Sequence, residues 1–180
     1  LMPVNIYKGE QTNRELQITI ANDLFDNPGL WSKVSAFNQL PENNFSDLEY
    51  VLDLIRQAGT SDSSLIRLKR VARYEDWARF SAFQTIVQSW HNDISANMRI
   101  VSDPWKGTIR PVVHDTLSLH PLSYKRAKTF DIIFGSGYDN PLLSIYHGSS
   151  DFLAEKYRML YGFVKDGLIL KAVQHFEEIY

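Results

Sequence analysis

The sequence predicts an α+β protein that is predominantly α-helical and contains one small β-ribbon. Three observations lead to this fold class. Apolar residues recur at spacings of three and four in several segments, alternating and β-branched residues gather around residues 98–113, and the chain contains no internal repeat. With 180 residues, of which 44% are hydrophobic, the chain is long enough to bury one core.

The first 44 residues differ from the rest of the chain. They mix Asn, Gly and Pro with short apolar runs such as Leu16–Ile20. This composition predicts a lead-in or connector with one short helix or strand. We therefore divide the chain into a lead-in, 1–44, and a helical unit, 45–180. Because Met2 follows Leu1, we also expect the chain to be a fragment of a longer protein.

The helical unit opens with three helices. Ser46 is a suitable N-cap with Glu49 three residues later, and the apolar stripe that follows ends at Gly59, which predicts a helix over 46–58. A short helix is expected after a polar break, with its apolar positions at Leu65, Leu68 and Val71. The third helix is longer and buried, and it leads towards His91; its apolar residues are Trp77, Phe80, Phe83, Ile86, Val87 and Trp90.

The β-ribbon follows this helix. Residues 98–101 alternate, 103–107 have turn chemistry, and 108–113 are rich in β-branched residues. A hairpin of this kind returns Asp115 to the neighbourhood of Asn97. Residues 116–140 then predict a long loop over that end of the ribbon.

Three further helices are predicted in the C-terminal part. Asn140 caps the first, with Pro141 at its first position, and Gly148 closes it. The second begins at Asp151, and Asp166 caps the last.

Composition excludes several classes of protein. The net charge is −2 and the basic residues are dispersed, whereas a nucleic-acid-binding domain has a stronger basic bias. The absence of cysteine excludes disulfides and thiolate metal sites. The sequence contains no run of about 18 apolar residues, so it does not predict a membrane-spanning helix. The densest basic group is interpreted as a solvated helix face; it contains Arg67, Lys69, Arg70 and Arg73.

The candidate site combines His91, Asp93, Asn97 and Asp115. Protein kinases use the same order of an Asp, an Asn and a second Asp, in which the first Asp orients the attacking hydroxyl and the other two side chains bind magnesium. On this pattern, Asp93 and His91 are the candidate catalytic residues, with His91 holding the loop in shape. Asn97 and Asp115 are the candidate magnesium ligands, because magnesium takes oxygen ligands and few protein carboxylates.

Two other interpretations remain open at these residues. Asp and Asn next to helices and strands often serve only as caps or turn residues. The second alternative is a hydrolytic His/Asp metal centre, because His114 adjoins Asp115 and His91 and His120 are near in sequence; their spacing matches no metalloenzyme motif. Trp105 in the turn either marks a partner surface or folds back onto the ribbon.

Residues 70–180 resemble the CotH-type spore-coat protein kinase family. The segments that carry the resemblance are Tyr74–Phe80, His91–Ile100, Gly107–Asp115, Asn140–Leu143 and Asp166–Gly167. The resemblance implies an atypical protein-kinase-like fold, of which this chain is the C-terminal lobe, and ATP- and magnesium-dependent phosphorylation of a Ser hydroxyl in a protein substrate. Asp93 then matches the catalytic Asp, Asn97 the Asn after it, and Asp115 the metal-binding Asp.

The resemblance also implies a partner and a setting. The nucleotide-covering strands and the phosphate-binding Lys belong to an N-terminal lobe of the same protein, without which we expect this chain to be inactive. A spore surface or cell envelope is the setting that the family implies, while the compartment stays open. The alternative is a non-catalytic binding or structural module of a larger bacterial surface protein. The family often has a second acid two residues after the first, whereas Thr116 and Leu117 follow Asp115 here, and this difference favours the module. The presence of all three of Asp93, Asn97 and Asp115 favours the enzyme.

Overall fold

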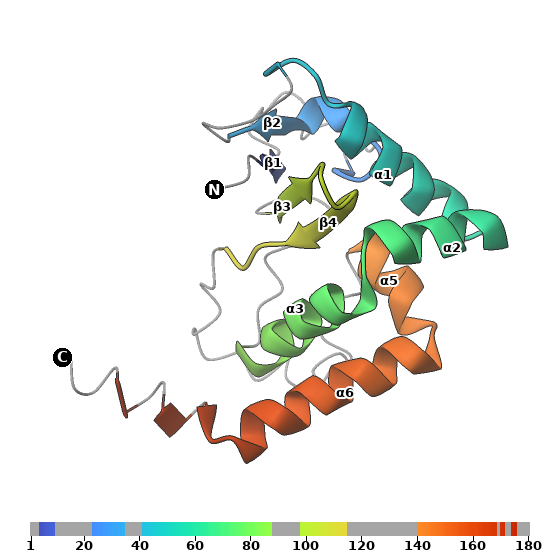
Figure 1. Ribbon diagram of the computed structural model, residues 1–180. Coiled ribbons are helices and arrows are strands. Elements are labelled where there is room, and N and C mark those ends of the chain that lie inside the picture. The colour runs from blue at the N-terminus through green and yellow to red at the C-terminus, as the bar shows by residue number, and fades with distance from the viewer. Residues whose placement is uncertain are drawn as a thin grey trace.

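Four short strands form one antiparallel sheet in the order β2-β1-β3-β4 (Figure 1). The computed structural model describes residues 4–9, 23–34, 41–87, 98–114, 140–168, 170–171 and 174–175. The strands are β1 (Asn5–Gly9), β2 (Trp31–Lys33), β3 (Met98–Asp103) and β4 (Thr108–Pro111). The predicted hairpin is therefore confirmed as β3 and β4, and the sheet is wider than the ribbon that the sequence predicts.

The two additional strands come from the predicted lead-in. Strand β1 pairs with β3 over its whole length, from Asn5 opposite Ser102 to Gly9 opposite Met98. It pairs with β2 on its other side. Two segments of residues 1–44, β1 and β2, are thus part of the same sheet as the hairpin.

Helices make up most of the described chain, which confirms the predicted α+β class with predominant helix. They are α1 (Ser46–Ala58), α2 (Asp62–Val71), α3 (Tyr74–Val87), α5 (Pro141–His147) and α6 (Ser150–Lys165), with a short 3-10 turn, η2 (Pro28–Leu30). Figure 1 shows α6 running alongside α3, with α5 connecting to it. Among the described helices, none combines the length and the apolar character needed to cross a membrane.

The helix ends follow local side-chain chemistry. The Asn140 side chain accepts a hydrogen bond from the Leu143 N–H at 3.2 Å, as predicted for the start of α5. Ser46 is the first residue of α1 rather than its cap, and its N–H donates to Asn44 at 3.0 Å. Asp166 is the C-cap of α6, so it closes this helix instead of opening the next one. Gly167, with φ of 63°, follows it.

The core lies between the sheet and the helices. One cluster of buried apolar side chains contains Tyr7 of β1, Leu48 and Leu52 of α1, Trp77 of α3, Tyr146 of α5 and Phe152 of α6. The interpretation of the α3 aromatic stripe as core is confirmed for Trp77 and Phe80, which are buried, while Phe83 is half-buried. Trp90 lies outside the described residues.

Candidate functional site

The four residues of the predicted site, His91, Asp93, Asn97 and Asp115, all lie outside the described residues. Their proximity and their ligand geometry therefore stay predictions. His120 of the alternative hydrolytic centre is outside as well. Of that centre only His114 is described, and it is exposed. Within the described ranges, no group of three or more His, Asp or Glu side chains is arranged to hold a metal ion.

The β3–β4 hairpin determines how the chain approaches the predicted site. Ile100 is opposite Pro111, and beyond β4 the Val112 N–H donates to the Arg99 carbonyl oxygen at 2.9 Å. Antiparallel pairing thus continues to within one residue of Met98, the neighbour of Asn97. Because paired strands lie about 5 Å apart, the two ends of the hairpin leave the sheet side by side.

The turn at the other end of the hairpin is ordered by Asp103. Its Oδ1 accepts hydrogen bonds from the backbone N–H groups of Trp105 at 3.1 Å and Lys106 at 3.2 Å. Gly107 completes the turn with φ of 59°. The side chain of Trp105 is 62% exposed, so the indole does not fold back onto the hairpin. This leaves the interpretation of Trp105 as part of a contact surface.

A cavity of about 310 Å³ lies where α3, β4 and α6 meet. It is lined by Asp76, Arg79, Phe80, Phe83, Arg110, Pro111, Val113 and Phe163. Sequence reasoning missed it because its walls come from three elements that are distant in the sequence. The cavity adjoins the end of the hairpin that leads to Asp115.

A second group that the sequence does not predict joins α3, α5 and α6. The Nε2 atom of His147 lies 3.3 Å from Ser81 Oγ and 3.5 Å from Lys156 Nζ. Burial, together with the Lys156 charge, lowers the pKa of His147 to about 4. Burial also lowers the pKa of Lys156 to about 8, and its side chain is fully buried. Because the described Ser81 and Lys156 are buried, this group holds the three helices together rather than presenting a nucleophile to solvent.

Asp47 links α1 to the sheet. Its carboxylate accepts hydrogen bonds from Asn5 Nδ2 at 2.9 Å and from the Tyr7 hydroxyl. Burial alone raises the pKa of Asp47, but hydrogen bonds from Ser102, Tyr7, Asn5 and the Leu48 backbone outweigh it and hold the pKa below its usual value. The contacts join residues of β1, β3 and α1, which indicates a structural role.

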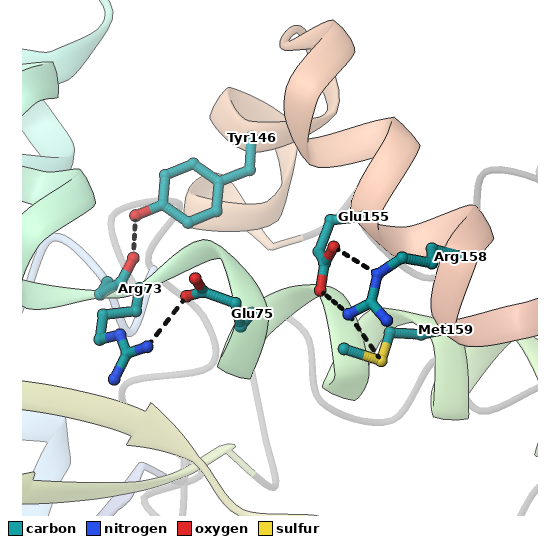
Figure 2. A network of polar contacts seen from close by, with 7 residues as sticks. Arg73, Glu75, Tyr146, Glu155, Arg158 and Met159 are labelled. Atoms are coloured by element: carbon teal, nitrogen blue, oxygen red, sulfur yellow. Dashed lines mark hydrogen bonds and ion pairs between the residues drawn. The ribbon is translucent and has the colours of Figure 1, made fainter. Parts of the chain in front are cut away.

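Two ion pairs near α3 and α6 lie at the surface. Figure 2 shows Arg73 directed at Glu75 and Arg158 directed at Glu155. The Arg73 pair spans 3.4 Å, and the Arg158 Nε to Glu155 Oε2 distance is 2.8 Å. Exposed pairs of this kind contribute about 1 kcal/mol or less to stability. We assign them no role in chemistry.

Comparison with known proteins yields no match: no family model, no curated protein and no solved structure is similar to this chain.

Proposed function

We propose that this chain is the helical lobe of an atypical kinase similar to the CotH type, which transfers a phosphoryl group from ATP to a Ser hydroxyl of a protein. The observation that supports this proposal is the register of the hairpin. It carries the backbone next to Asn97 and the backbone next to Asp115 out of the sheet at the same end. Two magnesium ligands that are distant in sequence require such a return of the chain.

The proposed chemistry needs little from the protein beyond positioning and charge neutralisation. Magnesium, when bound, neutralises the phosphate oxygens; the carboxylate of Asp115 and the amide oxygen of Asn97 are a donor set that suits it. Asp93 orients the acceptor hydroxyl and takes its proton as the oxygen attacks the γ-phosphorus. The bond from that phosphorus to the bridging oxygen breaks, and ADP leaves. His91 keeps the loop around Asp93 in shape.

The proposal includes an N-terminal lobe of the same protein as the partner that covers the nucleotide. Such a lobe supplies the strands and the Lys that bind phosphates in kinases. The residues of this chain supply the acceptor side and the metal ligands.

The test is calorimetric titration of ATP into the full-length protein with magnesium, for wild type and for Asp115→Ala. We expect Asp115→Ala to lose the magnesium-dependent part of the affinity. Asp62→Ala is the matched control, because Asp62 is an exposed acid on α2. Equal binding by wild type and Asp115→Ala contradicts the metal assignment. Labelled phosphate transfer that survives Asp93→Asn removes Asp93 from the mechanism.

A non-catalytic binding module is the second candidate, and the exposed Trp105 favours it. Tryptophan at an ordered, protruding turn is a common anchor of protein interfaces. This second function predicts two results for the full-length protein. It binds no ATP, and the Trp105→Ala variant no longer binds a protein partner that the wild type binds.

A further inference from the structure

The cavity between α3, β4 and α6 has a mixed lining that matches one class of ligand. Its apolar part consists of Phe80, Phe83, Pro111, Val113 and Phe163. Phe80 is 4% exposed and Val113 is 44% exposed, so the lining runs from the core to the surface. The volume of about 310 Å³ is at the lower end of ligand pockets, which suits one ring with a short substituent.

Two arginine side chains lie next to this apolar lining. Arg79 on α3 and Arg110 on β4 are both exposed. Neither guanidinium forms a hydrogen bond or an ion pair within the part of the chain that the structure describes. The Arg79 charge makes a minor contribution to lowering the pKa of Glu155 on α6, after the contributions of Arg158. Both side chains are therefore available to an anion.

The third charged residue of the lining limits the charge of the ligand. Asp76 lies one turn before Arg79 on α3 and also lines the cavity. Two Arg and one Asp give a formal lining charge of 2 − 1 = +1. A ligand with one negative charge neutralises the net charge of this lining. A dianion adds a second negative charge, which the Asp76 carboxylate repels. Arg binds a carboxylate with two parallel hydrogen bonds, which makes a carboxylate the best match.

We propose that this cavity binds a monoanionic carboxylate attached to an apolar ring, either as a free aryl acid or as part of a peptide. The ring packs on the phenylalanines, and the carboxylate binds Arg79 and Arg110. This inference does not depend on phosphoryl transfer, because it is argued only from described residues that line the cavity.

The test is calorimetric or NMR titration of the chain with 3-phenylpropionate, and separately with a blocked peptide in which Glu precedes Phe. We expect saturable binding of at least one probe. Arg79→Gln and Arg110→Gln should each weaken it about tenfold or more, as the loss of a charged hydrogen bond does. Both side chains are exposed, so neither change threatens folding. Arg67→Gln on α2 is the matched control and should bind like wild type.

The neutral amide of 3-phenylpropionate should bind at least tenfold more weakly than the acid. Tighter binding of the free acid identifies a small-molecule site, and tighter binding of the peptide identifies a peptide site; either outcome supports the carboxylate chemistry. The proposal is overturned if neither probe saturates, if the amide binds as well as the acid, or if the Arg79 and Arg110 variants bind like Arg67→Gln.

Discussion

The hydroxyl of Tyr146 on α5 donates a hydrogen bond to the backbone carbonyl of Ala72, at the end of α2 (Figure 2). The same hydroxyl lies 3.3 Å from the Leu68 carbonyl oxygen. Its ring packs on Tyr74 and Phe152, at centroid distances of 4.7 and 5.3 Å. One side chain thus ties the α2–α3 connection to α5 and α6. Burial raises the pKa of the phenol, so Tyr146 remains a donor at every ordinary pH.

Replacement of Tyr146 by Phe keeps the ring and removes this donor. The buried Ala72 carbonyl then loses a partner, which should lower the free energy of unfolding by about 1–3 kcal/mol. Urea unfolding followed by circular dichroism measures the change. Tyr157→Phe is the control, because Tyr157 is 42% exposed on α6 and should unfold like wild type. Equal midpoints for the two variants contradict a role for the Tyr146 hydroxyl.

Asp47→Asn should destabilise the contact between α1 and the sheet. The pKa of Asp47 is lower in the folded protein than in the unfolded chain, so the folded state binds fewer protons. The stabilisation is complete above the unfolded pKa of 3.8 and is lost as the pH falls through the lower folded pKa. Urea unfolding from pH 7 down to pH 2 should show a steeper loss for wild type than for Asp47→Asn.

The control for Asp47 is Asp53→Asn. Asp53 also lies on α1, but its side chain is 53% exposed, and among the described residues it pairs with Arg56 alone. This variant should keep the wild-type pH profile. An Asp47→Asn profile that parallels wild type down to pH 2 argues against the carboxylate as the link between α1 and the sheet.

The helices of this protein follow from neighbouring residues, whereas its strand pairing joins residues that are distant in the sequence. The stripe from Leu48 to Ile55 predicts α1 because helical periodicity is a property of neighbouring residues. The pairing of Tyr7 with Ile100 joins residues that are far apart in the sequence, and strands as short as β1 and β2 carry little pattern of their own. The sequence therefore does not predict that β1 and β2 of the lead-in pair with the hairpin in one sheet.

The candidate site shows the same limit. The order of Asp93, Asn97 and Asp115 is visible in the sequence, and the hairpin between the last two is confirmed. The cavity near Val113 was not predictable, because Phe163 reaches it from α6 only after the helices pack. A motif that depends on the spacing of residues can be predicted from the sequence. A cavity lined by three packed elements cannot, because its lining residues are distant in the sequence.

His147 should remain neutral well into the acid range. Its pKa is about 4 because burial and the nearby Lys156 disfavour the charged imidazole. With Lys156 charged and donating, Nε2 is the acceptor, which places the proton of the neutral ring on Nδ1. An NMR titration should give a midpoint near 4 for the resonance that disappears in His147→Gln. A midpoint near 6.5 contradicts the burial of this ring.

The same shift makes stability depend on pH between 6.5 and 4. The unfolded chain binds a proton at His147 in this window and the folded chain does not, so stability is complete above pH 6.5 and falls towards pH 4. A shift of 6.5 − 4 = 2.5 sets an upper limit of about 3 kcal/mol, which solvent screening at the partly exposed ring reduces. His147→Gln should flatten the profile in this window. His175→Gln, a change at an exposed side chain, should leave it as in wild type.

Substitution of Gly107 shows whether the stability of the hairpin turn depends on the positive φ of this residue. Its φ of 59° favours glycine, and a Cβ at this position meets no atom within 4 Å. Gly107→Ala should therefore lower the free energy of unfolding by about 1 kcal/mol through strain, without a clash. Gly107→Asn should cost less, because Asn tolerates this region better.

The matched control is Gly59→Ala at the end of α1. Its φ is −69°, and a Cβ there also meets nothing within 4 Å. Alanine restricts the unfolded chain at this position without strain in the folded one, so this variant should be stabilised by about 0.4–1 kcal/mol. Both substitutions add the same methyl group to open space, and only the sign of φ differs. Changes of the same sign in urea unfolding mean that the positive φ does not control the turn.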